Sequence, residues 1–182
     1  MSEVPRLQPG DYYVGLDLGK KQDPSALALI RKEGDKLRLV ALKVFPLETE
    51  YVAIVGYLKL VSERIRTVVR FLIDRTGVGE PFVDEAKQSI RGIEGLVLSM
   101  PAKQEVLGYL KMVMQSNRLL IPYELELTSE LNIERFELTK AGQVQFSHPS
   151  GSHDDRLWAV ALGVFATRET PCPAFKPISR SF

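Results

Sequence analysis

Aspartate occurs at three places in this sequence where a carboxylate is well placed to bind a cation. Asp17 interrupts an apolar run with the pattern of a buried strand, and Asp74 ends a second such run. Asp154 and Asp155 come where a helix is expected to begin. A carboxylate within an apolar strand is costly unless it is paired or binds a cation. The set therefore predicts one acidic, metal-binding cluster.

Carboxylate oxygens are the ligands that Mg²⁺ and Mn²⁺ prefer, and phosphodiester hydrolysis often uses two such ions about 4 Å apart. Asp17, on the expected central strand, is the candidate for the position between the ions, and Asp74 should lie on the neighbouring strand. The N-terminus of a helix favours anionic side chains, so Asp154 and Asp155 should stay ionised. Spacing does not separate these two; we favour Asp155 as the ligand, with Asp154 assisting or holding a water. The pattern predicts a two-metal nuclease.

Each aspartate also has a purely structural explanation. Asp74 alone would suit a turn after a strand, and Asp155 alone would suit a helix cap, since both positions favour aspartate for local reasons. Asp17 is harder to explain locally because apolar residues flank it on both sides. The combination, in this order along the chain, is what favours a site.

The hydrophobic periodicity predicts three strands, then helices alternating with strands. Thr49 is a candidate cap for the first helix. Strands are expected at 12–18, 25–30, 37–45, 68–74 and 96–98, an extended segment at 119–122 and a hairpin at 135–146. Helices are expected at 51–65, 80–89, 103–117, 124–132 and 154–167.

Short connections make the first three strands an antiparallel meander, and helical crossovers make the later strands parallel. The predicted fold is α/β, a ribonuclease H-like mixed sheet flanked by helices, with acidic residues at its centre. The domain should span 11–169, between a lead-in or linker at 1–10 and a proline-containing, mobile tail at 170–182.

The composition is that of a globular protein: of 182 residues, 45% are apolar and 26% charged, with a net charge of +1. Cys172, the one cysteine, excludes an internal disulfide and a cysteine-based zinc site, and fits the cytoplasm. No run approaches the length of a membrane span, and no signal pattern opens the chain. We therefore expect no membrane association.

Three motifs together resemble the nuclease domain of viral, phage-type terminase large subunits, a ribonuclease H-like family. The first is GLDLG at 15–19 with DPSA at 23–26, and the second is IDRTGVG at 73–79. The third is PSGSHDDRLWA at 149–159, in which His-Asp-Asp begins a helix. The third motif is fairly specific when it follows the other two, whereas the first alone is weak. The similarity extends from about 12 to 167.

The resemblance implies metal-dependent endonucleolytic cutting of concatemeric viral double-stranded DNA during genome packaging, in the host cytoplasm. It implies Asp17, Asp74 and Asp155 as metal ligands, with Asp154 adjacent. The implied partners are DNA, a packaging ATPase domain, the small terminase and the portal. The motor's phosphate loop, G-x-x-x-x-G-K-[ST], is missing from this sequence. The chain is therefore expected to be either the nuclease half of a longer protein or a stand-alone relative.

Four further residues are candidates for supporting roles. Lys20 and Lys21 follow the first strand and could contact DNA phosphates, although a solvated turn explains them as well. The resemblance places a basic residue near Lys103, for which surface exposure is the simpler explanation. His153 could orient a ligand or a water, or be an exposed or capping histidine.

Two other classes of function remain open. The opening strand also suits an actin-like nucleotide-binding domain, but that fold needs a second phosphate-binding hairpin and normally two domains. A catalytically inactive ribonuclease H-like scaffold that binds nucleic acid or a motor is the second, and clustered carboxylates argue against it. A junction resolvase or a nuclease for RNA:DNA hybrids would use the same chemistry.

Overall fold

The computed structural model describes residues 8–19, 23–77, 79–133, 135–138, 144–147 and 154–168. The strands are β1 Asp11–Asp17, β2 Ala26–Glu33, β3 Lys36–Val44, β4 Val68–Asp74, β5 Ile93–Leu96, β6 Leu119–Leu120, β7 Arg135–Leu138 and β8 Val144–Ser147. The helices are α1 Tyr51–Arg64, α2 Gly79–Ser89, α3 Met100–Gln115, α4 Leu125–Ile133 and α5 Asp155–Ala166.

The main sheet has the strand order β5-β4-β1-β2-β3-β6, which confirms the predicted mixed topology. Strands β1, β2 and β3 pair antiparallel as a meander, whereas β4 pairs parallel with β1 and β5 pairs parallel with β4. The predicted hairpin is also present, because β7 pairs antiparallel with β8. Strand β1 is thus central, with β4 and β2 as its neighbours.

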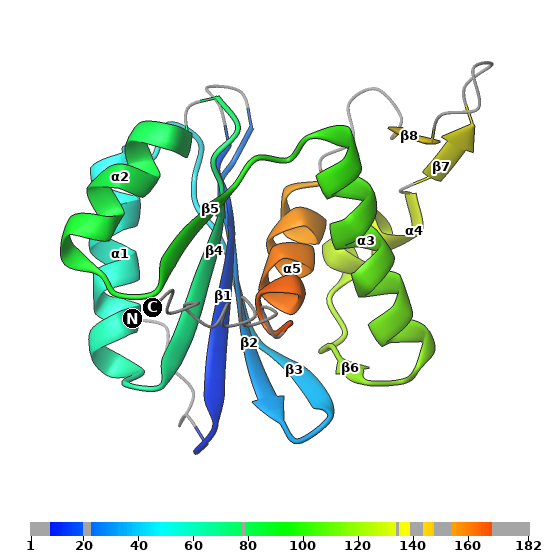
Figure 1. The fold of residues 1–182 in the computed structure, drawn as a ribbon, viewed down its shortest axis with the longest axis horizontal. Coiled ribbons are helices and arrows are strands. Elements are labelled where there is room, and N and C mark those ends of the chain that lie inside the picture. Colours follow the sequence, from blue (N-terminus) through cyan, green and yellow to red (C-terminus); the bar gives the residue numbers. More distant parts are fainter. Residues whose placement is uncertain are drawn as a thin grey trace, which may run out of the picture.

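Helices cover both faces of the sheet (Figure 1). Successive residues of β1 point to opposite faces, so Tyr12, Val14 and Leu16 join the core under α1 and α2. Tyr13 joins the other core, to which α3, α4 and α5 contribute. Helix α5 is buried along most of its length, so it is the central helix on this second face of the sheet.

Helix α5 packs on β1 with unusually close backbone contact, which two glycines permit. A Cβ atom added to Gly15 would lie 2.1 Å from the carbonyl oxygen of Ala159 and 2.2 Å from the nitrogen of Gly163. A Cβ on Gly163 would in turn lie 2.9 Å from a side-chain carbon of Ile30. The missing side chains therefore let the helix backbone rest directly on the strand.

Some predicted details are wrong, for local reasons. The strand expected at 96–98 is Ile93–Leu96, which lies in register with β4 and leaves Val97 exposed. Thr49 does not cap α1: its hydroxyl donates to the carbonyl of Pro46 at 2.6 Å, and the N-cap position is Glu50. Ser99 caps α3, so that helix begins at Met100, earlier than expected.

None of the helices in the described part of the chain combines the length and apolar character that spanning a bilayer requires.

Candidate active site

Strand pairing brings Asp17 and Asp74 to the same end of two adjacent parallel strands. The register pairs Leu16 with Ile73, so the next residues, Asp17 and Asp74, end β1 and β4 side by side. Leu72 belongs to the core on the α5 side, and the alternation of side chains places Asp74 on that same face. The same alternation from Tyr13 places Asp17 there as well. Both carboxylates therefore face the layer that contains α5.

Asp17 lies among other negative charges. Burial and the charges of Asp74, Asp155 and Asp154, in that order of size, raise the pKa of Asp17 well above its usual value of 3.8. The positive charge of Lys103 acts in the opposite direction. Three of the aspartates that the sequence analysis selected are thus within electrostatic reach of the fourth, Asp17. Such a group of carboxylates is unfavourable without a cation, as at other acidic functional sites.

The turn after β4 holds the Asp74 carboxylate. Its Oδ1 accepts hydrogen bonds from the backbone N–H of Thr76 at 2.8 Å and from the Thr76 hydroxyl at 2.6 Å. The Thr76 hydroxyl oxygen accepts a further bond from the N–H of Leu98 at 2.9 Å. Gly77 follows with φ of 70°, a conformation that favours glycine. Thr76 and Gly77 of the second motif therefore orient the Asp74 carboxylate.

Helix α5 supplies the other two aspartates. Asp155 is its first residue and is buried, with 6% of its surface exposed. Asp154 is the N-cap residue but makes no capping hydrogen bond; its Oδ2 accepts instead from the indole N–H of Trp158 at 2.8 Å. The Lys103 ammonium lies 4.9 Å from the centroid of the Trp158 ring, a cation–π contact. Lys103 and Trp158 thus flank the acidic cluster together.

The donor set suits a hard divalent cation. Asp17, Asp74 and Asp155 would offer only carboxylate oxygens, the ligands that Mg²⁺ and Mn²⁺ prefer. Within the described ranges, no three acidic, histidine or cysteine side chains are close enough to enclose one ion. One oxygen of Asp74 and one of Asp154 are engaged by Thr76 and Trp158, so side-chain rotation would accompany metal binding.

The predicted supporting residues divide into two groups. Lys103, which the resemblance placed near the site, lies within electrostatic reach of Asp17 in the first turn of α3. Lys20, Lys21 and His153 lie outside the described residues.

Sequence reasoning missed Thr76, Trp158 and Glu130 as residues that hold the site. A tryptophan in an apolar helix is most simply explained as a core residue, and Trp158 is indeed buried. Only its spacing of four residues from Asp154 could have indicated the hydrogen bond between them.

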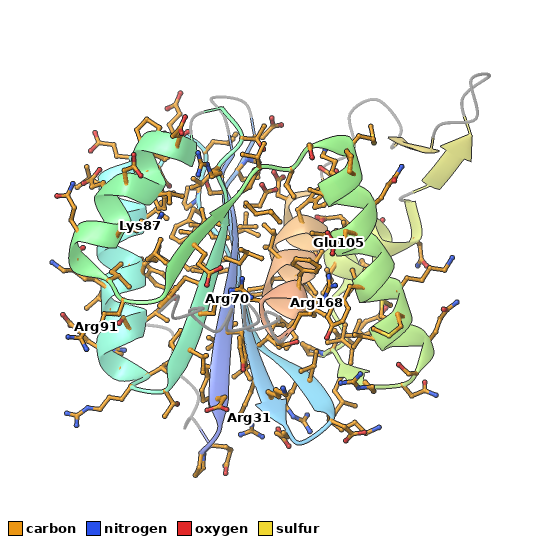
Figure 2. The ribbon with its side chains drawn as sticks, viewed as in Figure 1. Arg31, Arg70, Lys87, Arg91, Glu105 and Arg168 are labelled. Carbon is orange, nitrogen blue, oxygen red and sulfur yellow. The ribbon has the colours of Figure 1, made fainter. Side chains whose placement is uncertain are left out.

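Three arginines of the domain are paired with glutamates away from the acidic cluster. Arg31, Arg70 and Arg168, labelled in Figure 2, form ion pairs with Glu33, Glu94 and Glu105 respectively. In that view they lie in the middle and lower part of the molecule, whereas β1 and β4 end at its top. These arginines are therefore not the cations that balance the acidic cluster.

The sequence matches no protein-family model and no curated protein. Solved structures do match. The large terminase nuclease from thermophilic phage G20c gives a TM-score of 0.71 at 23% identity, over 84% of this chain and 80% of that one. Its magnesium-bound form gives 0.72 at 23% identity, over 85% and 80%.

A longer chain matches as well. The large terminase of bacteriophage HK97 gives a TM-score of 0.68 at 15% identity, covering 89% of this chain but only 40% of that one. The domain described here therefore has the ribonuclease H-like fold of large terminase nucleases. At these identities the likeness establishes the fold, and it agrees with the resemblance read from the three motifs.

Proposed function

We propose that this chain is the metal-dependent endonuclease domain of a viral terminase large subunit, which cuts concatemeric double-stranded DNA during genome packaging. One observation carries the proposal: the fold brings Asp74, Asp155 and Asp154 close to Asp17. Their negative charges, together with burial, raise the pKa of Asp17. These residues come from two strands and a helix that are far apart in the sequence. A fold without a cation site would gain nothing from gathering them.

Asp17, Asp74 and Asp155 would hold two Mg²⁺ or Mn²⁺ ions, with Asp154 assisting. Bound ions of this kind lower the pKa of water and stabilise the charge that develops on phosphate oxygens. The protein's part is to position the carboxylates: Thr76 orients Asp74, and α5 presents Asp155. We assign Lys103 to balancing charge and contacting DNA phosphate, Lys20 and Lys21 to further phosphate contacts, and His153 to orienting a ligand or a water.

The names of the structural neighbours support the setting. The large terminase nuclease from phage G20c has been solved with bound magnesium, with bound cobalt and with bound zinc. We infer that this domain works beside a packaging ATPase domain, with the small terminase and portal as further partners, in the host cytoplasm. We expect little sequence readout, because none of the helices in the described ranges carries the cluster of basic residues typical of a recognition helix.

The direct test is cleavage of supercoiled plasmid DNA by the purified chain with Mn²⁺ or Mg²⁺, followed on agarose gels. We expect linear and shorter products, and no cutting with EDTA. Intact plasmid with both metals, at protein concentrations that bind DNA, would contradict the proposal.

The two adjacent aspartates should differ in their contributions. We expect Asp155→Asn to lower the cleavage rate by at least about 100-fold, because replacing even residues that only support metal ligands costs about 10–100-fold. Asp154→Asn should cost about 10-fold, since one of its oxygens already accepts from Trp158. Single-turnover cleavage rates at saturating Mn²⁺ measure both effects. Equal losses, or a larger loss for Asp154→Asn, would reverse this assignment.

One observation favours a second candidate, a scaffold that binds DNA or a motor without cutting. Among the described residues, no three candidate ligand side chains enclose an ion, and Asp74 is engaged by its own turn. Calorimetry with Mn²⁺ separates the two: the nuclease must bind the ion, whereas the scaffold need not.

A further inference from the structure

Helix α5 obtains its N-terminal cap from another helix. The first backbone N–H groups of a helix lack partners within it, and the N-cap side chain usually accepts from one of them. Asp154 occupies that position but makes no such bond. The N–H of Leu157, the third residue of α5, donates instead to Oε2 of Glu130 at 2.9 Å. Glu130 belongs to α4, 27 residues earlier in the chain.

The same carboxylate also holds the side chain of the residue after Asp155. Oε1 of Glu130 accepts from an Nη atom of Arg156 at 2.9 Å. Arg156 also lies 3.6 Å from a carboxylate oxygen of Glu124, measured from its Nε. Glu130 itself is 7% exposed. A charge buried this far is costly unless it is paired and hydrogen-bonded, and here both oxygens of Glu130 have a partner.

These two bonds fix the segment that carries the site. Arg156 and Leu157 directly follow Asp155, so holding them to α4 fixes the backbone of the first turn of α5, the helix that packs on β1 and carries Asp155. Because Glu130 supplies the cap, the Asp154 carboxylate is not used for capping and bonds Trp158 instead. Misplacing a reacting group by about 1 Å can cost about 100-fold in rate, so such a clamp matters for chemistry as well as stability.

We propose that Glu130 is a positioning residue of the nuclease site: it clamps the first turn of α5 through Leu157 and Arg156 and so sets Asp155 against Asp17. This inference rests on the proposed function. Glu130 touches none of the candidate ligands in the contacts above and acts only through the helix.

The test compares three variants of Glu130 with a control on the same helix. Glu130→Ala removes both bonds; Glu130→Gln keeps the length and an acceptor; Glu130→Asp keeps the charge but shortens the reach. Glu126→Ala is the matched control, because Glu126 lies exposed on α4. Mn²⁺ affinity is measured by calorimetry at a temperature at which circular dichroism shows each variant folded, and the cleavage rate is measured separately.

We expect Glu130→Ala to weaken Mn²⁺ binding by about 10–100-fold, the usual effect of losing a group that orients a metal ligand. Glu130→Gln should restore most of the affinity, and Glu130→Asp should restore less. Glu126→Ala should bind as the wild type does. If Glu130→Ala does not fold, the Mn²⁺ affinities of the other two variants decide. Tighter binding by Glu130→Asp than by Glu130→Gln would mean that Glu130 forms only a structural ion pair, and would overturn the proposal.

The two proposals fail in different ways. If the wild type cuts DNA and the Glu130 variants bind Mn²⁺ and cut as it does, the positioning role is wrong and the nuclease stands. If the wild type binds Mn²⁺ without cutting, the nuclease is wrong, and the affinities of the variants still decide the role of Glu130. A wild type that binds no Mn²⁺ overturns both.

Discussion

Asp17→Asn should abolish DNA cleavage and, in the absence of metal, make the protein more stable. Cleavage should fall by at least about 100-fold, the usual cost of removing one group that stabilises developing charge. Stability should rise at neutral pH, because burial and three neighbouring carboxylates disfavour the charge that asparagine lacks. Stabilising substitutions of this kind give about 0.5–2 kcal/mol. For a domain of this size that corresponds to a rise of roughly 1–8 °C in melting temperature.

The gain from Asp17→Asn should depend on pH in a definite direction. The raised pKa means that folded Asp17 keeps its proton at a pH where the unfolded chain has lost it. The wild type therefore loses stability as the pH rises from about 3.8 through the higher pKa of the folded state. The difference in melting temperature between variant and wild type should be larger at pH 7.5 than at pH 4.5, both with EDTA.

Metal should reverse the comparison. Mn²⁺ at about 100 times its dissociation constant adds about 2.7 kcal/mol to a protein that binds it only when folded. The wild type should gain this stability and Asp17→Asn should not. Asp84→Asn, on the exposed side of α2, is the control and should change stability by less than about 0.5 kcal/mol. The assignment of Asp17 is wrong if its asparagine variant melts below the wild type in EDTA, or cuts at the wild-type rate.

The positions of Asp17 and Asp74 at the ends of two adjacent strands could be predicted from the sequence. Apolar residues around Asp17 and before Asp74 have the period of strands, and sheet pairing then leaves few ways to arrange them. The parallel pairing of β1 with β4 was predicted, and it confirms the two aspartates as neighbours. The strand expected at 96–98 shows the limit of this reasoning. Gly92 turns the chain early, and the less apolar segment from Ile93 makes the pairing with β4.

The residues that hold the site in place could not be found this way. In the sequence, Glu130 looks like an ordinary helix residue. Its role depends on a hydrogen bond to α5, 27 residues later in the chain. A buried tryptophan such as Trp158 is expected to be a core residue, and nothing local indicates that its indole N–H donates to Asp154. Local patterns identify groups that could bind a metal. The supporting contacts depend on tertiary packing, which cannot be inferred from local patterns in a single sequence.

Gly15→Ala should strongly destabilise the domain, because the added methyl group has no space between β1 and α5. Its Cβ would lie 2.1 Å from Ala159 O and 2.2 Å from Gly163 N, and both are backbone atoms that no rotamer change can move. Overpacking a core costs typically about 1–3 kcal/mol and occasionally more, and we expect at least about 3 kcal/mol here. Urea denaturation measures the loss.

The same substitution should impair cleavage beyond its effect on stability. Relief of the clash requires α5 to move away from β1, and that movement carries Asp155 away from Asp17, with about a 100-fold loss for a displacement of about 1 Å. Gly108→Ala in α3 is the matched control: its Cβ would meet nothing within 4 Å, so the variant should gain about 0.5–1 kcal/mol and cut normally. Equal stability of the two alanine variants would mean that α5 does not rest on β1 as described, and the placement of Asp155 over the strand ends would fall with it.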